Sequence, residues 1–456
     1  MKRALWLVPV LCASAILVGS SANAAKPPAC ARPQGPPQPP TATTSENIGQ
    51  AYFCIGDHYA RVVDNRSLLQ SAFSGLANEL HKRGLDQADA TVPAFTGDRD
   101  SDWEAFKAVY DRVTGRLSPE VRQAVAEAAM TKMVASLDDN HAHWQHPGPR
   151  PPQDKPYGLG FLVSPAPPLM QNVPDQAVPP VYITAVAQVA TDAGLKVGDI
   201  IEAVNGQTPF VDGVPSPGVY KLLGQDYPRS DQVRLTVKRP ATGRTWTVTM
   251  KPKFFDAPPR QLLESKKLPG DIASLVLHGF APDAADQIFQ VLKDMGTVKG
   301  MVLDLRGNGG GSPDAVRKLV SALVHNKTYS FWCDRAGTCT PNKTDDSVPL
   351  LNIPLVVLTD RECASACDAF TSAVKDLKLG TVIGTRTAGA VSGPAGGYLL
   401  SDNSLISFPE QHEKGANGEV INGVGVAPDI YLPRTAEDLS KGRDPGLAKA
   451  LALLTH

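Results

Sequence analysis

Two short segments carry the residue types of nucleophilic catalysis, and the first is rich in glycine. Residues 304–311 follow an apolar run and end in three adjacent glycines before Ser312-Pro313, a typical helix start. Glycines let backbone N–H groups approach a ligand, and a helix N-terminus adds positive potential. The segment therefore suits an oxyanion or a phosphate, but it fits neither the dinucleotide-binding nor the phosphate-loop pattern. Taken alone, it could equally be a structural turn.

The second segment contains Ser365 between an apolar run, residues 356–360, and a helical run. A serine at a strand-to-helix corner projects its hydroxyl while the helix start polarises its surroundings, as a nucleophile requires. The alternative use of such a serine is a helix N-cap. Cys363 and Cys367 flank Ser365, and a bond between them would rigidify the corner.

The composition excludes some classes of protein. The 456 residues include 45 Lys or Arg and 46 Asp or Glu, which leaves a net charge of −1. This balance argues against a nucleic-acid binder, which needs an excess of basic residues. With 42% hydrophobic and 20% charged residues, the chain can form packed cores. Its length suggests about three domains.

The N-terminus resembles a secretory signal. Lys2 and Arg3 precede an apolar run, and Ala22-Asn23-Ala24 is a typical cleavage site, so residues 1–24 are predicted to be removed. A membrane anchor is the alternative, but the run is shorter than the roughly 18 residues a span needs. We therefore expect an exported protein, periplasmic or extracellular, with no stable membrane span after cleavage.

An exported protein can keep disulfides. Cleavage leaves six cysteines: Cys30, Cys54, Cys333, Cys339, Cys363 and Cys367. Spacing favours a bond between Cys333 and Cys339 around a turn, and the other pairings stay open. No paired C-x-x-C spacing of a zinc site is present.

The periodicity of apolar residues divides the chain into five further parts. Proline-rich residues 25–45 predict a disordered tether. Residues 46–150 follow a helical period, and residues 155–255 alternate as in a small, mostly β domain. Strands and helices alternate through residues 260–435, which predicts an α/β layer with parallel strands. Residues 436–456 are predicted to be a C-terminal helix.

The β domain resembles a PDZ domain of the type found in bacterial proteases. The resemblance rests on residues 193–201, on residues 204–206 and on one loop. That loop consists of Gly158, Leu159, Gly160 and Phe161. In PDZ domains such a loop binds a peptide's terminal carboxylate through backbone N–H groups, and the peptide joins a sheet edge. The alternative is a β-sandwich whose glycines only turn the chain.

The chain as a whole resembles the serine peptidases of the C-terminal processing and tricorn-core family. The resemblance spans residues 50–432 and is strongest at residues 304–311, around Ser365, and at residues 384–389 and 423–429. It implies a multidomain α/β protein: a helical N-terminal region, an inserted PDZ domain and a crotonase-like (ClpP-like) α/β catalytic domain.

The same resemblance assigns roles to residues of the site. It implies that Ser365 is the nucleophile and that the N–H of Ala366 and a glycine N–H, from Gly309 or Gly310, hold the oxyanion. Processing peptidases pair the serine with a lysine at the position that Ala390 occupies here. A Ser-Lys dyad in that geometry is therefore not available.

The tricorn-like branch instead uses a histidine from the N-terminal region, and residues 137–143 look like that segment. We therefore predict His141 as the general base, since a neutral imidazole accepts a proton at physiological pH. Asn140 and Asn422 stand where that branch has a hydroxyl and a glutamate. Two amides can bond each other and the ring, but they stabilise an imidazolium less than a carboxylate does.

Three alternatives compete with this interpretation. His141, His143 and His146 are spaced closely enough for a zinc cluster, but the resemblance accounts for His141 without a metal. The protein could be an inactive peptidase-like ligand- or peptide-binding protein, or a crotonase-like acyl-CoA enzyme. The favoured prediction is an exported serine endopeptidase that acts on protein or peptide substrates and needs no metal or cofactor. Tricorn-like relatives allow a homo-oligomer.

Overall fold

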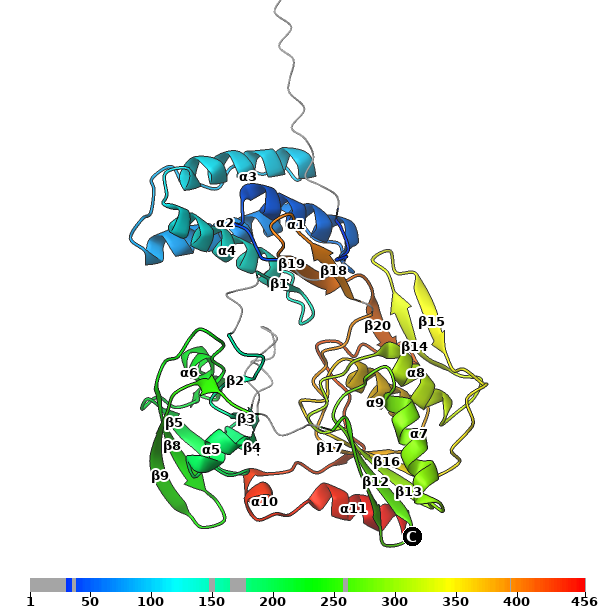
Figure 1. Cartoon of the computed structure of the whole chain (residues 1–456). Coiled ribbons are helices and arrows are strands. Elements are labelled where there is room, and N and C mark those ends of the chain that lie inside the picture. The colour runs from blue at the N-terminus through cyan, green and yellow to red at the C-terminus, as the bar shows by residue number, and fades with distance from the viewer. Residues whose placement is uncertain are drawn as a thin grey trace, which may run out of the picture.

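The chain folds into three bodies, each with its own apolar core, as Figure 1 shows. The computed structural model describes residues 30–34, 38–146, 152–164, 178–256, 261–393 and 395–455. The predicted signal peptide, residues 1–24, lies outside these described residues. No helix within the described part of the chain is both long and apolar enough to cross a membrane.

The N-terminal body is a bundle of four helices closed by a small sheet. The helices are α1 (Ser45–His58), α2 (Asn65–Lys82), α3 (Arg99–Thr114) and α4 (Pro119–Ala135). Apolar residues at helical spacing face the bundle core, and Pro119 begins α4 as its sequence predicts. The sheet runs in the antiparallel order β1 (His143–Gln145), β19 (Leu405–Pro409) and β18 (Ala395–Leu399). Two strands from far along the chain thus complete the N-terminal core.

The residues before α1 correct the expectation of a disordered tether. Cys30 forms a disulfide with Cys54, and Ala31 pairs with Leu399 on β18. The Thr41 N–H donates to the carbonyl of Asp402 at 2.9 Å. For the described part of residues 25–45, the prediction was therefore wrong. An extended, proline-rich chain can still bond the edge of a sheet, and the disulfide fixes it there.

The β module follows the bundle. Its antiparallel sheet has the order β3 (Phe161–Ser164), β4 (Tyr182–Val186), β5 (Ile200–Val204), β8 (Val233–Arg239) and β9 (Arg244–Met250). Two short helices pack on it, α5 (Gln188–Asp192) and α6 (Pro217–Leu223). The remaining strands are the pair β2 (Tyr157–Gly158) and β10 (Lys253–Phe254) and the pair β6 (Phe210–Val211) and β7 (Val214–Pro215). The predicted carboxylate loop leads directly into β3, which is an edge strand.

The third body contains the predicted alternation of strands and helices. Its sheet has the order β11 (Leu263–Leu268), β12 (Ile272–Leu277), β13 (Gly300–Asp304), β16 (Leu355–Thr359), β17 (Thr381–Gly384) and β21 (Ile430–Tyr431), with only β11 antiparallel. The helices of one face are α7 (Ala284–Met295), α8 (Pro313–Ser321) and α9 (Ala366–Asp376). A second sheet consists of β15 (Cys339–Lys343), β14 (Thr328–Cys333) and β20 (His412–Gly415). Every residue of β16 is buried, as expected for a strand covered on both faces.

Two helices replace the single C-terminal helix predicted for residues 436–456. They are α10 (Ala436–Ser440) and α11 (Pro445–Leu454), separated by a turn in which Gly442 has a φ of +66°. α11 covers the second face of the parallel sheet, and α10 contacts the β module at Gly198 (Figure 1). A Cβ at Gly198 would come within 2.3 Å of the Ser440 nitrogen, so this docking needs a glycine.

We predict that the buried side chain of Ile406, where β19 pairs with β1 and β18, contributes strongly to stability. Ile406 is 0% exposed and pairs with Trp144 on one side and Tyr398 on the other. Ile406→Ala should lower the free energy of unfolding by about 2–5 kcal/mol because it opens a cavity. Leu453→Ala, at a 40% exposed position of α11, is the control and should change it by about 0.5 kcal/mol or less. Equal urea-denaturation midpoints for both variants would contradict the prediction.

Candidate active site

Ser365 lies at a strained corner between β16 and α9. Its φ is +57° and its ψ −119°, a backbone conformation that non-glycine residues rarely adopt. The Ser365 N–H points toward the carbonyl of Ala390, at 2.8 Å, and a carboxylate oxygen of Asp368, at 3.0 Å. Such strain persists only where the surrounding structure enforces it, and it is typical of functional residues.

A disulfide between Cys363 and Cys367 spans the corner, and both cysteines are fully buried. It joins the loop before Ser365 to the first turn of α9. The bond between Cys333 and Cys339, which the spacing favoured, is also present. The disulfide at the corner restricts the backbone on both sides of the serine.

Asp368 ties the corner to the loop of residues 387–390. Its side chain is 0% exposed and accepts hydrogen bonds from the N–H groups of Gly389 and Ala390, each at 3.0 Å, and from the Thr387 hydroxyl. Burial raises the pKa of Asp368 to about 6, although these donors oppose the rise. The sequence analysis missed this residue. Its signal was an aspartate at the third position of a helix after a serine N-cap.

The glycine segment packs directly against Ser365. A Cβ on Gly310 would lie 2.7 Å from the Ser365 Cβ, so only glycine fits. The N–H of Gly310, however, donates to the Asn308 side chain at 2.9 Å. No hydrogen bond within the described residues uses the N–H of Gly309 or of Ala366. These two N–H groups, rather than that of Gly310, are therefore available to an oxyanion.

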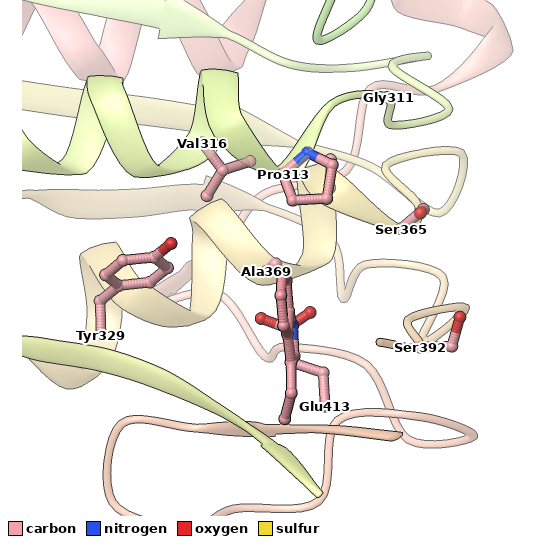
Figure 2. Close-up of a pocket in the computed structure, with 10 residues that line it drawn as sticks. Gly311, Pro313, Val316, Tyr329, Ser365, Ala369, Ser392 and Glu413 are labelled. Atoms are coloured by element: carbon pink, nitrogen blue, oxygen red, sulfur yellow. The ribbon is translucent and has the colours of Figure 1, made fainter. Parts of the chain in front are cut away.

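A small cavity of about 30 Å³ lies beside Ser365 (Figure 2). It has room for about two water molecules. The residues that line it are Gly311, Pro313, Val316, Tyr329, Trp332, Ser365, Ala366, Ala369, Ser392 and Glu413. Ser365, the candidate nucleophile, therefore lines a pocket with both apolar and polar walls.

Glu413 is the acidic residue of this cavity, and the sequence analysis did not single it out. It lies on β20 opposite Trp332 of β14 and is buried. Burial raises the pKa of Glu413 to about 7, while hydrogen-bonding groups of Ser330 and Trp332 oppose the rise. Only the pairing of β14 with β20 brings Glu413 to the cavity, and no local sequence pattern indicates it.

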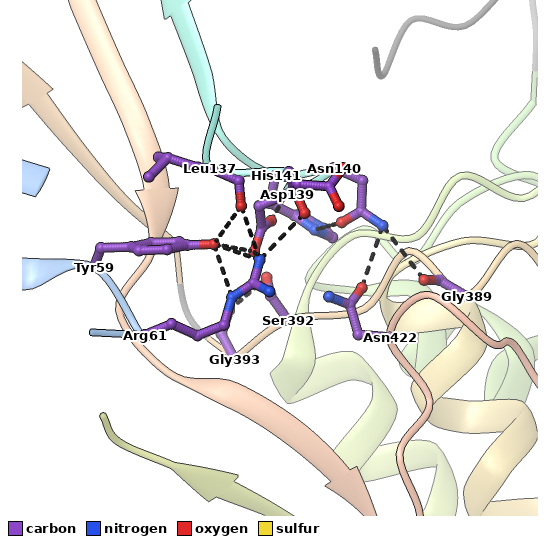
Figure 3. A network of polar contacts seen from close by, with 11 residues as sticks. Tyr59, Arg61, Leu137, Asp139, Asn140, His141, Gly389, Ser392, Gly393 and Asn422 are labelled. Carbon is purple, nitrogen blue, oxygen red and sulfur yellow. Dashed lines mark hydrogen bonds and ion pairs between the residues drawn. The ribbon is translucent and has the colours of Figure 1, made fainter. Parts of the chain in front are cut away.

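Asn140 contacts the His141 ring and is itself bonded to Asn422 (Figure 3). Its Nδ1 lies 2.7 Å from the Asn140 Oδ1, and the Asn140 Nδ2 donates to Asn422 Oδ1 at 3.2 Å and to the carbonyl of Gly389 at 3.3 Å. Because an amide oxygen only accepts, Nδ1 carries the proton and Nε2 keeps its lone pair. Through Gly389, this network reaches the loop that binds the Ser365 N–H.

The histidine and the serine are neighbours of one loop but do not form a dyad in this structure. Within the described residues, no hydrogen bond joins Ser365 Oγ to the His141 ring, and His141 does not line the cavity. Ser365 therefore contacts the loop of residues 389–390 directly and His141 reaches it through Asn140, but their side chains do not form the hydrogen bond that proton transfer from Ser365 to His141 would need.

Three residues that the sequence analysis missed position the histidine segment. The His141 N–H donates to Asp139 at 2.9 Å, and Asp139 accepts a second hydrogen bond from the Tyr59 hydroxyl at 3.0 Å. Arg61 donates to the Leu137 carbonyl at 3.1 Å (Figure 3). Burial lowers the pKa of His141 below its ordinary value of 6.5, and Asp139 opposes this. The ring is therefore neutral at pH 7, as a base must be.

The other two histidines make different contacts. His143 pairs with Ser407 through β1, and His146 Nε2 lies 2.9 Å from the carbonyl of Thr41. Across the described ranges, no group of three His, Cys, Asp or Glu side chains could hold a metal ion. That the site works without metal stays a prediction.

The predicted carboxylate loop of the β module reaches the candidate active site through β3. Leu159 is buried in the module's core, and the carbonyl of Gly160 accepts from the Ala187 N–H at 2.7 Å. Phe161 begins β3, and at its end the Ser164 hydroxyl donates to Glu362 at 2.8 Å. Glu362 directly precedes Cys363, so the edge strand of the module contacts the loop that leads to Ser365.

The comparisons with known proteins agree with a peptidase fold. In structure, the chain is similar to the photosystem II D1 C-terminal processing protease, with a TM-score of 0.53 and 23% identity over 90% of this chain and 97% of that one. This likeness confirms the mixed α/β fold. In sequence, residues 271–432 match the model of peptidase family S41.

Two relatives match the sequence beyond residues 271–432, over more than half of the chain. Tricorn protease homolog 1 of Streptomyces coelicolor is 30% identical over 275 residues, 58% of this chain and 24% of that protein. The chloroplastic C-terminal processing peptidase of Tetradesmus obliquus is 30% identical over 265 residues, 53% of this chain and 54% of that protein. The matches thus span about a quarter and about half of these relatives. Residues 271–432 thus match the S41 peptidase model, and about half of the chain is similar in sequence to tricorn and C-terminal processing peptidases.

We predict that Glu413 makes stability depend on pH. Because burial raises its pKa from 4.5 to about 7, the folded state holds the proton more tightly than the unfolded state. This contribution to stability is present below pH 4.5 and is lost as the pH rises to 7. Between pH 5 and 8, the wild type should therefore lose about 1–3 kcal/mol more than Glu413→Gln.

Urea denaturation at both pH values measures this difference. Glu104→Gln, at an exposed position of α3, is the matched control and should follow the wild type. If Glu413→Gln and the wild type show the same pH dependence, the carboxyl is not buried in the way described here.

Proposed function

We propose that this protein is an exported serine endopeptidase that hydrolyses peptide bonds of protein substrates. The observation that carries the proposal is the corner at Ser365. A strained serine begins a helix, packs on a glycine loop with unused N–H groups, and shares the loop of residues 389–390 with an oriented histidine. The homology to S41 peptidases supports the same chemistry.

In the proposed mechanism, Ser365 Oγ attacks the substrate carbonyl while His141 Nε2 takes the hydroxyl proton. The carbonyl oxygen becomes an oxyanion, to which the N–H groups of Ala366 and Gly309 donate. When the tetrahedral intermediate collapses, the C–N bond breaks and the imidazolium gives its proton to the leaving amine. Water, deprotonated by the same histidine, then hydrolyses the acyl-enzyme and releases Ser365.

Substrate binding must bring Ser365 and His141 together, because proton transfer needs about 2.6–3.2 Å between the two atoms. Hydrogen bonds of a catalytic site often tighten only in the substrate complex. Asn140 orients the ring but adds no negative charge, so the imidazolium is stabilised less than beside a carboxylate. We therefore expect slower turnover than in a carboxylate-supported triad.

The lack of a hydrogen bond between Ser365 and His141 among the described residues also favours a second candidate, an inactive peptidase-like protein that binds peptides. This candidate needs the same cavity and β module but no proton transfer. It differs from the first in one respect that is easily measured, since Ser365 would then be dispensable for its function.

The β module and the N-terminus supply the rest of the proposal. Five antiparallel strands with an exposed edge at β3, preceded by the glycine loop, support a PDZ-like role in binding peptide C-termini. Three disulfides and the signal-like N-terminus support export to an oxidising compartment.

The peptidase proposal predicts that casein is cleaved by wild-type protein, residues 25–456, in the presence of a metal chelator. Ser365→Ala and His141→Ala should each lower the rate by about 100-fold or more, because each removes a group that takes part in proton transfer or attack. His143→Ala, two residues along the same segment, is the control. Absence of cleavage by the wild type, together with retained peptide binding, would favour the second candidate.

The pH dependence of kcat/KM tests the role of the two asparagines. A base must be neutral, so activity should fall below the pKa of His141, at a midpoint under 6.5. Asn422→Asp places a negative charge on the partner of Asn140 and stabilises the imidazolium, so the midpoint should rise. Asn78→Asp, on the exposed face of α2, adds the same charge elsewhere and should not move it. A midpoint that is unchanged or lower in Asn422→Asp would contradict this role.

A further inference from the structure

The cavity beside Ser365 contains a buried acid that the proposed mechanism does not use. In the antiparallel pair of β14 and β20, Trp332 and Glu413 are directly opposite, so their side chains lie on the same face of the sheet. This face is turned toward α9, and Figure 2 shows the Glu413 side chain rising toward Ala369 in the pocket that Ser365 also lines. The acid therefore lies where a substrate side chain next to the attacked carbonyl would enter.

Glu413 has no cationic partner among the described residues, because no ion pair includes it. Its polar neighbours are Ser330 and Trp332, which are uncharged, and Asp368, whose negative charge repels it. Buried carboxylates are usually paired with a cation. A ligand that brings a positive charge would supply the missing partner.

The other walls of the cavity suit the rest of a basic side chain. Pro313, Val316 and Ala369 are apolar and can contact a methylene stem. Tyr329 and Trp332 offer aromatic rings, which attract cations. Because the cavity of about 30 Å³ holds only about two waters, such a side chain must displace them and widen the pocket.

We infer that Glu413 is a specificity determinant, and that the cavity binds the lysine or arginine side chain of the residue whose carbonyl Ser365 attacks. This inference rests on the proposed function for the identity of the attacked bond. It names a chemical class of substrate: unfolded segments or peptides with an accessible basic residue.

Matched peptide substrates test the inference. Two fluorogenic peptides differ only at the residue before the cleaved bond, which is lysine in one and norleucine in the other. Norleucine keeps the aliphatic stem and lacks the ammonium group. The wild type should cleave the lysine peptide with a kcat/KM at least tenfold higher, and Glu413→Gln should reduce this ratio at least tenfold. Glu104→Gln should keep the wild-type ratio. Equal rates in the wild type, or an unchanged ratio in Glu413→Gln, would overturn the inference.

A binding measurement separates this inference from the peptidase proposal. Product peptides that end in lysine or norleucine are titrated calorimetrically into Ser365→Ala, which cannot form an acyl-enzyme. At least tenfold tighter binding of the lysine peptide supports the role of Glu413 even if the wild type cleaves nothing. Equal affinity overturns it even if casein is cleaved. Neither result depends on whether Glu413→Gln folds.

Discussion

The carboxylate of Asp368 organises the candidate active site from inside the protein. It is shielded from solvent, and it accepts hydrogen bonds from Ser365, Gly389 and Ala390 and from the Thr387 hydroxyl. A buried acceptor that lost these donors would cost several kcal/mol, so the helix start and the loop are constrained to stay together. The strained backbone of Ser365 and the position of residues 387–390 both depend on this one group.

The same loop connects the serine to the N-terminal body. The carbonyl of Gly389 binds Asn140, which orients His141, and the histidine segment continues into β1. Because β1 pairs with β19, the position of His141 depends partly on strands that follow Ser365 in sequence. Ser365 belongs to the C-terminal α/β body, and His141 lies between α4 and β1 of the N-terminal body, so residues of both bodies contribute to the candidate site. The hydrogen bond from Ser164 to Glu362 connects the β module to the corner as well.

The secondary-structure elements and the candidate site residues that short stretches of sequence indicate could be predicted. Period and turn residues located the helices of the bundle and the alternation of strands and helices. The resemblance to the processing and tricorn-core peptidases pointed to Ser365, His141 and the two asparagines. The structure places Asn140 against Asn422, as two adjacent amides allow.

Long-range pairing could not be predicted: nothing in residues 395–409 indicates that they complete a bundle formed by residues 45–135. The position of Glu413 in the cavity could not be predicted for the same reason, since it depends on the register between β14 and β20. The resemblance left Gly309 and Gly310 as alternative oxyanion donors, and the sequence could not show that the N–H of Gly310 donates to the Asn308 side chain.

We propose above that Ser365 is a nucleophile and that His141 activates it. Reaction with a fluorophosphonate, followed by mass spectrometry of the intact protein and of its peptides, tests this without knowledge of the substrate. We expect one adduct, on Ser365, that forms about 100-fold more slowly in His141→Ala. An unlabelled Ser365, or labelling at the same rate in His141→Ala, would contradict it.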